Sequence, residues 1–146
     1  EKYNVPNEFD LLSLDIDSHD FYVLNKILEK YSPRIIVCEY NATHLPHEDK
    51  VVLRDTTDFQ GNYFVASILS FYKLGIKHKY SLVYSNKKGV NIFFVRNDLI
   101  NNSVYKILNI NDVFKIYNTP KYGKGPNGGH PQDPLNRDYI SSDKIL

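Results

Sequence analysis

The hydrophobic period of the chain changes twice near its start, and this pattern constrains the fold more than any other feature. Apolar residues alternate along residues 10–16 in the way expected for a strand that is covered on both faces. From Asp17 onward the spacing becomes helical, and it continues over residues 20–31 until a Ser-Pro pair. Residues 34–39 then form a short apolar run with a charged residue at each end. Because a helix commonly links two parallel strands, this order predicts a βαβ unit.

The middle of the chain adds a second helix and a hairpin. Residues 41–61 have mixed polarity and little periodicity, which predicts a long loop. The pattern over residues 62–74 predicts a helix with Gly75 as its C-terminal stop. Residues 79–85 and 90–97 are β-rich runs separated by a turn of hairpin length. We therefore expect an α/β fold with a mixed sheet of four main strands, two parallel and two in a hairpin, with flanking helices.

The C-terminal part is different in composition. After a weaker helical pattern over residues 110–117, residues 119–146 begin with a stretch too rich in Gly and Pro for a helix or a strand. We therefore divide the chain into a domain at residues 1–118 and a tail at residues 119–146. The tail is either disordered or draped over the domain, and a draped tail could bring His130 near a functional cleft. Its anchors would then be Tyr122, Tyr139 and Ile140.

Charge and composition argue against several classes of partner. Eighteen basic and seventeen acidic residues give a net charge of +1, and no dense basic cluster predicts a nucleic-acid surface. No apolar stretch reaches the length of a bilayer, so we expect no membrane span. The single Cys38 lies in an apolar run and is predicted to be a buried, inert thiol, which favours a reducing, cytoplasmic location. The chain begins with neither a signal peptide nor a methionine, and we expect it to be part of a longer protein.

Four segments together resemble the C-terminal half of FkbM-type methyltransferases, which are class I, Rossmann-like and dependent on S-adenosylmethionine. The segments are DLLSLDIDSHDFYVLNKIL, RIIVCEYNA, QGNYFVASI and NIFFVRNDL. The resemblance covers about residues 10–99. It implies the C-terminal half of a Rossmann-like methyltransferase sheet, with an acceptor cleft at the ends of the strands at residues 10–16 and 34–39.

Two departures from the family pattern stand out. FkbM-type sequences usually have Lys before the first acidic residue and Glu-Gly after it, whereas residues 14–20 read Leu-Asp-Ile-Asp-Ser-His-Asp here. In addition, no Gly-x-Gly loop follows a strand. The resemblance therefore implies that the S-adenosylmethionine site lies mostly outside this chain.

Acidic and amide side chains follow both strands of the predicted βαβ unit. Ligands of open α/β sheets collect outside the carboxyl ends of the strands, so these side chains should face one cleft. Asp17, Glu39 and Asn41 offer oxygen ligands that Mg²⁺ accepts, and a bound ion would orient an acceptor hydroxyl and lower its pKa. The alternative is structural: Asp17 would cap the helix, and Glu39 would accept backbone hydrogen bonds.

His19 is the candidate general base, acting beside Asp17, because a histidine next to carboxylates titrates near neutrality. The alternative is an exposed histidine at a helix N-terminus. His44 and His47 flank Pro46, which prevents the regular helix that would align them as a metal pair.

Two functions remain open from the sequence. The first is an enzyme fragment that, with a preceding half, transfers a methyl group to O or N of a small-molecule or glycan acceptor. The second is a non-catalytic binding or assembly domain with the same fold. In both, strand 10–16 would lack its neighbour, so its edge should pair with an upstream half or mediate self-association. We further expect that the chain alone does not bind S-adenosylmethionine with useful affinity.

Overall fold

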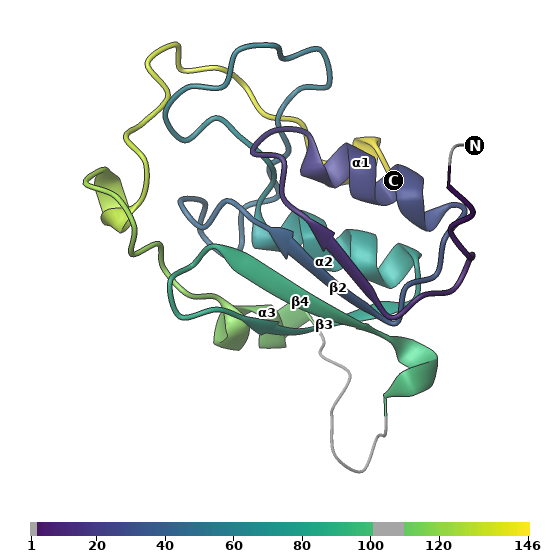
Figure 1. Ribbon diagram of the computed structural model, residues 1–146. Coiled ribbons are helices and arrows are strands. Elements are labelled where there is room, and N and C mark those ends of the chain that lie inside the picture. The colour runs from purple at the N-terminus through teal and green to yellow at the C-terminus, as the bar shows by residue number, and fades with distance from the viewer. Residues whose placement is uncertain (1–2, 101–109) are drawn as a thin grey trace.

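The computed structural model describes residues 3–100 and 110–146 and has an α/β arrangement built on one mixed sheet (Figure 1). The strand order is β1-β2-β4-β3. The strands are β1 (Leu11–Leu14), β2 (Ile35–Glu39), β3 (Tyr80–Ser85) and β4 (Asn91–Arg96). The helices are α1 (Asp20–Leu28), α2 (Ile68–Lys77) and α3 (Ile110–Ile116), with short 3-10 turns η1 (Asn97–Leu99), η2 (Pro126–Gly128) and η3 (Ser142–Lys144).

Strand pairing confirms the predicted topology. β1 and β2 are parallel, with Leu14 opposite Cys38. β4 pairs antiparallel with both β2 and β3, and the β3–β4 ladder is irregular between Leu82 and Tyr84. β1 is therefore an edge strand of this sheet, with β2 as its neighbour.

The two faces of the sheet differ in how they are covered. α1 and α2 lie on the same side of the sheet (Figure 1), and the core lies between them and the inward-facing side chains, including Ile36, Cys38 and Phe94. On the other face, Leu11, Ile35 and Tyr84 are exposed. The prediction that the first strand is covered on both faces is therefore not met within the described residues. Burial raises the pKa of Cys38, which agrees with an inert thiol.

Helix α2 begins and ends later than the sequence pattern predicts. Its N-cap is Ser67, whose hydroxyl accepts a hydrogen bond from the Ser70 N–H, and the preceding segment pairs with a neighbouring loop through an Ala66–Val51 bridge. Gly75 is not the stop, because the helix continues to Lys77. A β-carbon at Gly75 would lie 2.9 Å from the Phe94 ring, so glycine lets α2 approach the sheet closely.

The tail is draped over the domain. It runs beside the loop of residues 41–66 (Figure 1), and its last turn, η3, contacts α2. Ile140 pairs with Val51 in an antiparallel bridge, and the Tyr63 hydroxyl donates to the Asp138 carbonyl at 2.8 Å. Near the end of the tail, Ser142 is buried. Of the two predicted states of residues 119–146, the structure therefore has the packed one.

Candidate functional site

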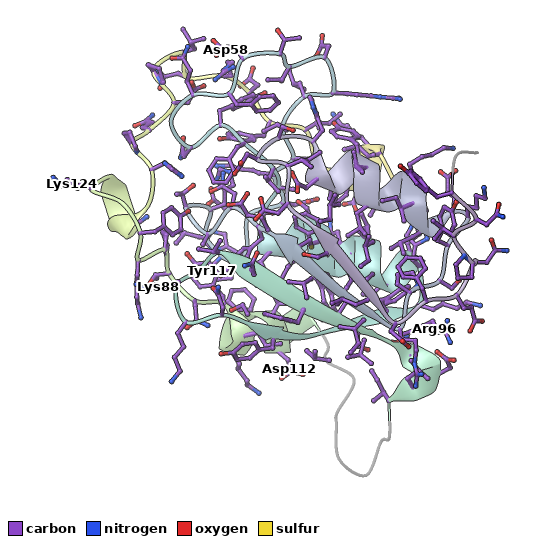
Figure 2. The ribbon with its side chains drawn as sticks, viewed as in Figure 1. Asp58, Lys88, Arg96, Asp112, Tyr117 and Lys124 are labelled. Atoms are coloured by element: carbon purple, nitrogen blue, oxygen red, sulfur yellow. The ribbon has the colours of Figure 1, made fainter. Side chains whose placement is uncertain are left out.

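Three carboxylates meet where β1 and β2 end. Asp15 directly follows β1, Asp17 lies two residues further, and Glu39 is the last residue of β2. Because β1 and β2 are parallel and Leu14 is opposite Cys38, their carboxyl ends bring Asp15 beside Glu39. One oxygen from each of the three residues lies within 4.8 Å of the others. Arg96 marks the opposite end of the sheet, and Asp58 lies at the end where the loop and the tail meet (Figure 2).

Glu39 is the unusual member of this acidic cluster. Its residue surface is only 9% exposed, and its Oε2 is buried without a hydrogen-bond partner among the described residues. Burial, together with the negative charges of Asp15, Asp17 and Asp20, raises the pKa of Glu39 to about 8. The Tyr122 hydroxyl is also buried and unpartnered, and its pKa is raised to about 12 by burial and by Glu39. The cluster therefore holds one buried oxygen, Glu39 Oε2, for which the described residues supply no partner.

The loop after β1 fixes the direction of Asp17. The Asp20 carboxylate accepts hydrogen bonds from the backbone N–H groups of Ile16 and Ser18, at 3.0 and 3.1 Å. Asp17 itself has a φ of 56°, in the left-handed region that aspartate tolerates better than most residues. It is therefore Asp20, and not Asp17, whose side chain organises the start of α1.

A strained valine supports the same loop from the other side. Val65 has a φ of 52°, which is unfavourable for a β-branched residue, and its N–H donates to the Ser18 carbonyl at 2.9 Å. Its own carbonyl accepts from the Val52 N–H. Backbone strain of this kind persists only where surrounding contacts impose it, and it often lies near functional sites.

Asp17 opens into a cavity of about 220 Å³ whose other walls come from the loop and the tail. Phe59, Gly61 and Phe64 line it together with His130. The His130 ring lies edge-on to Phe64, with centroids 5.3 Å apart. The draped tail therefore brings His130 to a cavity that Asp17 also lines.

Glycine permits this approach of the tail. A β-carbon at Gly125 would lie 2.1 Å from the His130 carbonyl oxygen, so the turn before His130 closes only with glycine. Gly61 has a φ of 57°, and a β-carbon there would lie 2.7 Å from the carbonyl oxygens of Pro131 and Gln132. The glycines of the loop and the tail thus position the histidine over the cavity.

The predicted ligand Asn41 has other contacts. The Asn41 amide nitrogen donates to the Asn62 and Phe64 carbonyls, and its oxygen accepts from the N–H and hydroxyl of Thr43. This network ties β2 to the loop, so a metal-ligand role for Asn41 would require breaking it. Asp15, which the sequence analysis did not select as a ligand, is in the cluster instead.

His19 lies beside the cavity without lining it. Its Nε2 is 3.4 Å from the Leu53 carbonyl oxygen, and its ring packs edge-on against Tyr22 and Phe59. It occupies the N-cap position of α1 but makes no capping hydrogen bond through its side chain. The predicted general-base role of His19 stays a prediction.

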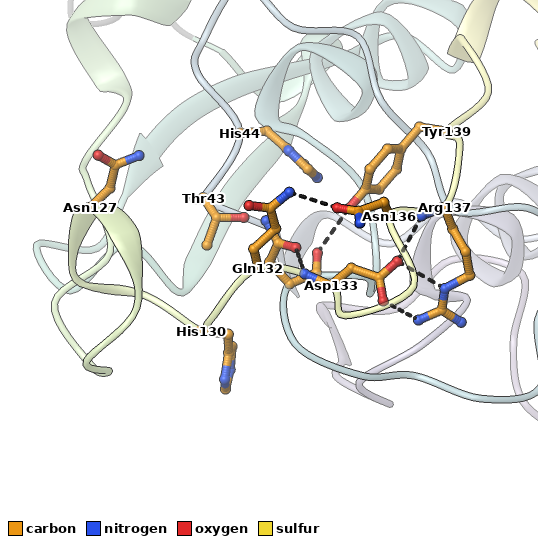
Figure 3. Close-up of a pocket in the computed structure, with 10 residues that line it drawn as sticks. Thr43, His44, Asn127, His130, Gln132, Asp133, Asn136, Arg137 and Tyr139 are labelled. Carbon is orange, nitrogen blue, oxygen red and sulfur yellow. Dashed lines mark hydrogen bonds and ion pairs between the residues drawn. The ribbon is translucent and has the colours of Figure 1, made fainter.

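Figure 3 shows a second cavity, of about 240 Å³. His130 lines both this cavity and the first. The walls of the second cavity carry carboxamides, an aromatic ring and an ion pair formed by Asp133 and Arg137. His44 lines it while only 3% exposed, and its Nε2 has no hydrogen-bond partner among the described residues. Burial, together with Lys50, lowers the pKa of His44 to about 4. Nothing in the sequence pattern indicated this cavity, because most of its walls come from the tail.

Comparisons of this chain with protein-family models, with curated proteins and with solved structures gave no match. Over residues 3–100 and 110–146, no helix is both long enough and apolar enough to cross a membrane.

Proposed function

We propose that the chain binds a divalent cation through Asp15, Asp17 and Glu39, as the acceptor side of an S-adenosylmethionine-dependent methyltransferase. The observation that supports this most is the buried Glu39 carboxylate. Its Oε2 has no hydrogen-bond partner among the described residues, and one of its oxygens lies within 4.8 Å of an oxygen of Asp15 and of Asp17. Buried polar atoms in native proteins nearly always have a partner, and an exception needs an explanation. A cation that enters this cluster would supply one.

The residues present fit a hard cation such as Mg²⁺. Mg²⁺ and Mn²⁺ prefer carboxylate oxygens and retain several waters, so three carboxylates from adjacent strand ends form a sufficient protein contribution. Without a cation, repulsion among Asp15, Asp17 and Glu39 favours a proton on Glu39. A bound cation would orient an acceptor hydroxyl and lower its pKa.

We propose His130 as the group that receives the acceptor proton, in place of His19. His130 lines the cavity with Asp17, whereas the described ring nitrogen contact of His19 is to the Leu53 carbonyl. A general base must lie within reach of the proton that it removes, and this geometry favours the tail histidine. Because the chain has no glycine-rich strand-loop-helix, we propose that S-adenosylmethionine is bound mainly by residues outside it.

Cation binding is tested by isothermal titration calorimetry with Mg²⁺ and with Mn²⁺. Because the ion must displace a proton from Glu39, affinity should rise between about pH 6.5 and about pH 8.5, with release of about one proton per ion at the lower pH. Glu39→Gln should abolish binding, because the amide keeps the shape and removes the charge. Asp10→Asn is the matched control, because Asp10 is exposed at the other end of β1 and pairs with Arg34. Absence of binding to the wild type, or unchanged binding to Glu39→Gln, would contradict the proposal.

The second candidate function is assembly, and the uncovered sheet face favours it. Leu11 and Ile35 present apolar surface beside the β1 edge. The partner would be an upstream half or a second copy of the chain. The molecular mass in solution together with the titration with Mg²⁺ and Mn²⁺ separates the two functions: assembly alone predicts self-association that Ile35→Lys abolishes, with no cation binding.

A further inference from the structure

The cavity beside His130 is polar, and Asp133 and Arg137 in its lining neutralise each other as an ion pair. Its lining includes the carboxamides of Asn62, Asn127, Gln132 and Asn136. The guanidinium of Arg137 is engaged by Asp133, with Nη2 at 2.9 Å from Oδ1 and Nε at 3.0 Å from Oδ2. A paired arginine offers no free cation to a phosphate or a carboxylate, so an anionic ligand is disfavoured.

Arg137 is also held on its other side. Its guanidinium lies over the Tyr63 ring, 4.0 Å from the centroid, and the pairing lowers the pKa of Asp133 to about 2. The ion pair is therefore part of the cavity wall. The cavity presents neutral donors and acceptors around it, together with the flat ring of Tyr139 (Figure 3).

His44 supplies the strongest indication that a ligand belongs here. It is 97% buried against Tyr139, with ring centroids 4.7 Å apart, and its ring points toward Gln132 and Asn136 (Figure 3). Its Nε2 has no partner among the described residues. The exposed side chains of Gln132 and Asn136 are joined to each other by one hydrogen bond of 2.9 Å. A ligand hydroxyl that replaces this bond would reach His44 and both amides.

We infer that this cavity binds a single sugar ring, held by His44 and the amides of Gln132 and Asn136. Several neutral hydroxyl groups match several carboxamides and a neutral imidazole, and an aromatic ring suits the apolar face of a pyranose. A cavity of about 240 Å³ matches one ring better than a longer chain. Because His130 lines both cavities, a hydroxyl of the sugar would lie on the side of Asp17. This last step rests on the proposed function, in which that hydroxyl is the methyl acceptor.

The inference is tested by saturation-transfer NMR with five monosaccharides: glucose, galactose, mannose, fucose and N-acetylglucosamine. We expect transfer to at least one sugar at millimolar concentration, together with a shift of the His44 ring signals. Gln132→Ala combined with Asn136→Ala should weaken binding at least about tenfold, the loss expected for two hydrogen bonds. Gln60→Ala is the control, because Gln60 is exposed and bonds to Asp58 outside the cavity.

The NMR measurement, repeated on Glu39→Gln, separates this inference from the cation proposal. Glu39→Gln should bind the sugar as the wild type does, because Glu39 does not line this cavity. Sugar binding by Glu39→Gln without cation binding by the wild type would support the sugar site and overturn only the cation site. Absence of transfer to all five sugars, or transfer that the double variant retains, would overturn the inference. Binding of inorganic phosphate with the same His44 shift, in place of a sugar, would also overturn it.

Discussion

Two carboxylates, Asp49 and Glu39, lie in similarly enclosed positions and have opposite environments. Asp49 accepts hydrogen bonds from Ser70, Ser141 and the Ser142 N–H, and it pairs with Lys73 at 2.9 Å. Burial alone would raise the pKa of Asp49, but these donors outweigh it and hold the pKa well below its usual range. Glu39 has only other acids as charged neighbours, and its pKa is raised to about 8.

The difference indicates what each carboxylate is for. Asp49 joins the loop, α2 and the end of the tail, so its negative charge stabilises the folded chain. Glu39 has no such donors among the described residues, and its charge is unfavourable in the folded chain. A group that a fold leaves unsatisfied at the carboxyl end of a strand is a candidate for ligand binding. The following predictions test this contrast, beginning with the largest effect.

Asp49→Ala should destabilise the folded chain by about 3 kcal/mol, because it removes several hydrogen bonds to one charged group. The contribution of Asp49 is present above its unfolded pKa of 3.8 and is lost as the pH falls below that value. Urea unfolding at neutral pH and at about pH 3 should therefore show a smaller difference between variant and wild type at the acidic pH. An equal difference at both values would contradict this account.

Glu39→Gln should have the opposite sign and stabilise the chain by about 2 kcal/mol near pH 8 in the absence of cations. A carboxyl whose folded pKa is raised contributes most below its unfolded pKa of 4.5, and that contribution is lost as the pH rises through about 8. The free energy of unfolding of the wild type should thus fall between pH 4.5 and about pH 8, whereas that of the variant should fall less. Thermal unfolding across the same pH range measures it. A destabilised variant would mean that Glu39 has a structural partner.

Lys73→Met should destabilise by about 1 kcal/mol and raise the pKa of Asp49 toward its ordinary value. Lys73 contacts both Asp49 and Asp143, at 2.9 and 2.7 Å, so its loss weakens the attachment of the tail. Hydrogen exchange should show faster exchange of the amides near Ser142, and the acid-unfolding midpoint should move to higher pH. Exchange that is unchanged there would show that the serines alone hold Asp49.

Lys26→Ala should change the free energy of unfolding by less than about 0.5 kcal/mol. Lys26 pairs with Glu29 on the exposed side of α1, where water screens both charges. The hydrogen bond from Lys26 lowers the pKa of Glu29, so that pKa should return toward its ordinary value in the variant. Chemical denaturation and NMR titration measure both effects. A large change in the free energy of unfolding would contradict this. It would show that an exposed carboxylate such as Glu29 can matter as much as the less exposed Asp49 and Glu39.

The sequence by itself determined the local elements and their order. Period-two and helical spacings predict β1, α1, β2 and the β3–β4 hairpin because side chains on a strand or helix face the core at fixed intervals. The parallel pairing of β1 and β2 follows from the helix between them, and with it the proximity of Asp17 and Glu39. The start of α2 was predicted too early because the positive φ of Val65 and the bridge at Ala66 are tertiary effects.

Tertiary structure alone decided which polar side chains remain without partners. Glu39 is the last residue of β2 and Asn41 lies two residues further. The Asn62 and Phe64 carbonyls engage the amide of Asn41, whereas no described donor reaches Glu39 Oε2. His44 and His130 became cavity residues because the tail folds back across the loop, held by Asp49 and by the Ile140–Val51 bridge. Such contacts join residues that are far apart in the chain, and their energies depend on burial and on the donors nearby. The spacing of residues along the sequence indicates neither the burial of a side chain nor the donors near it.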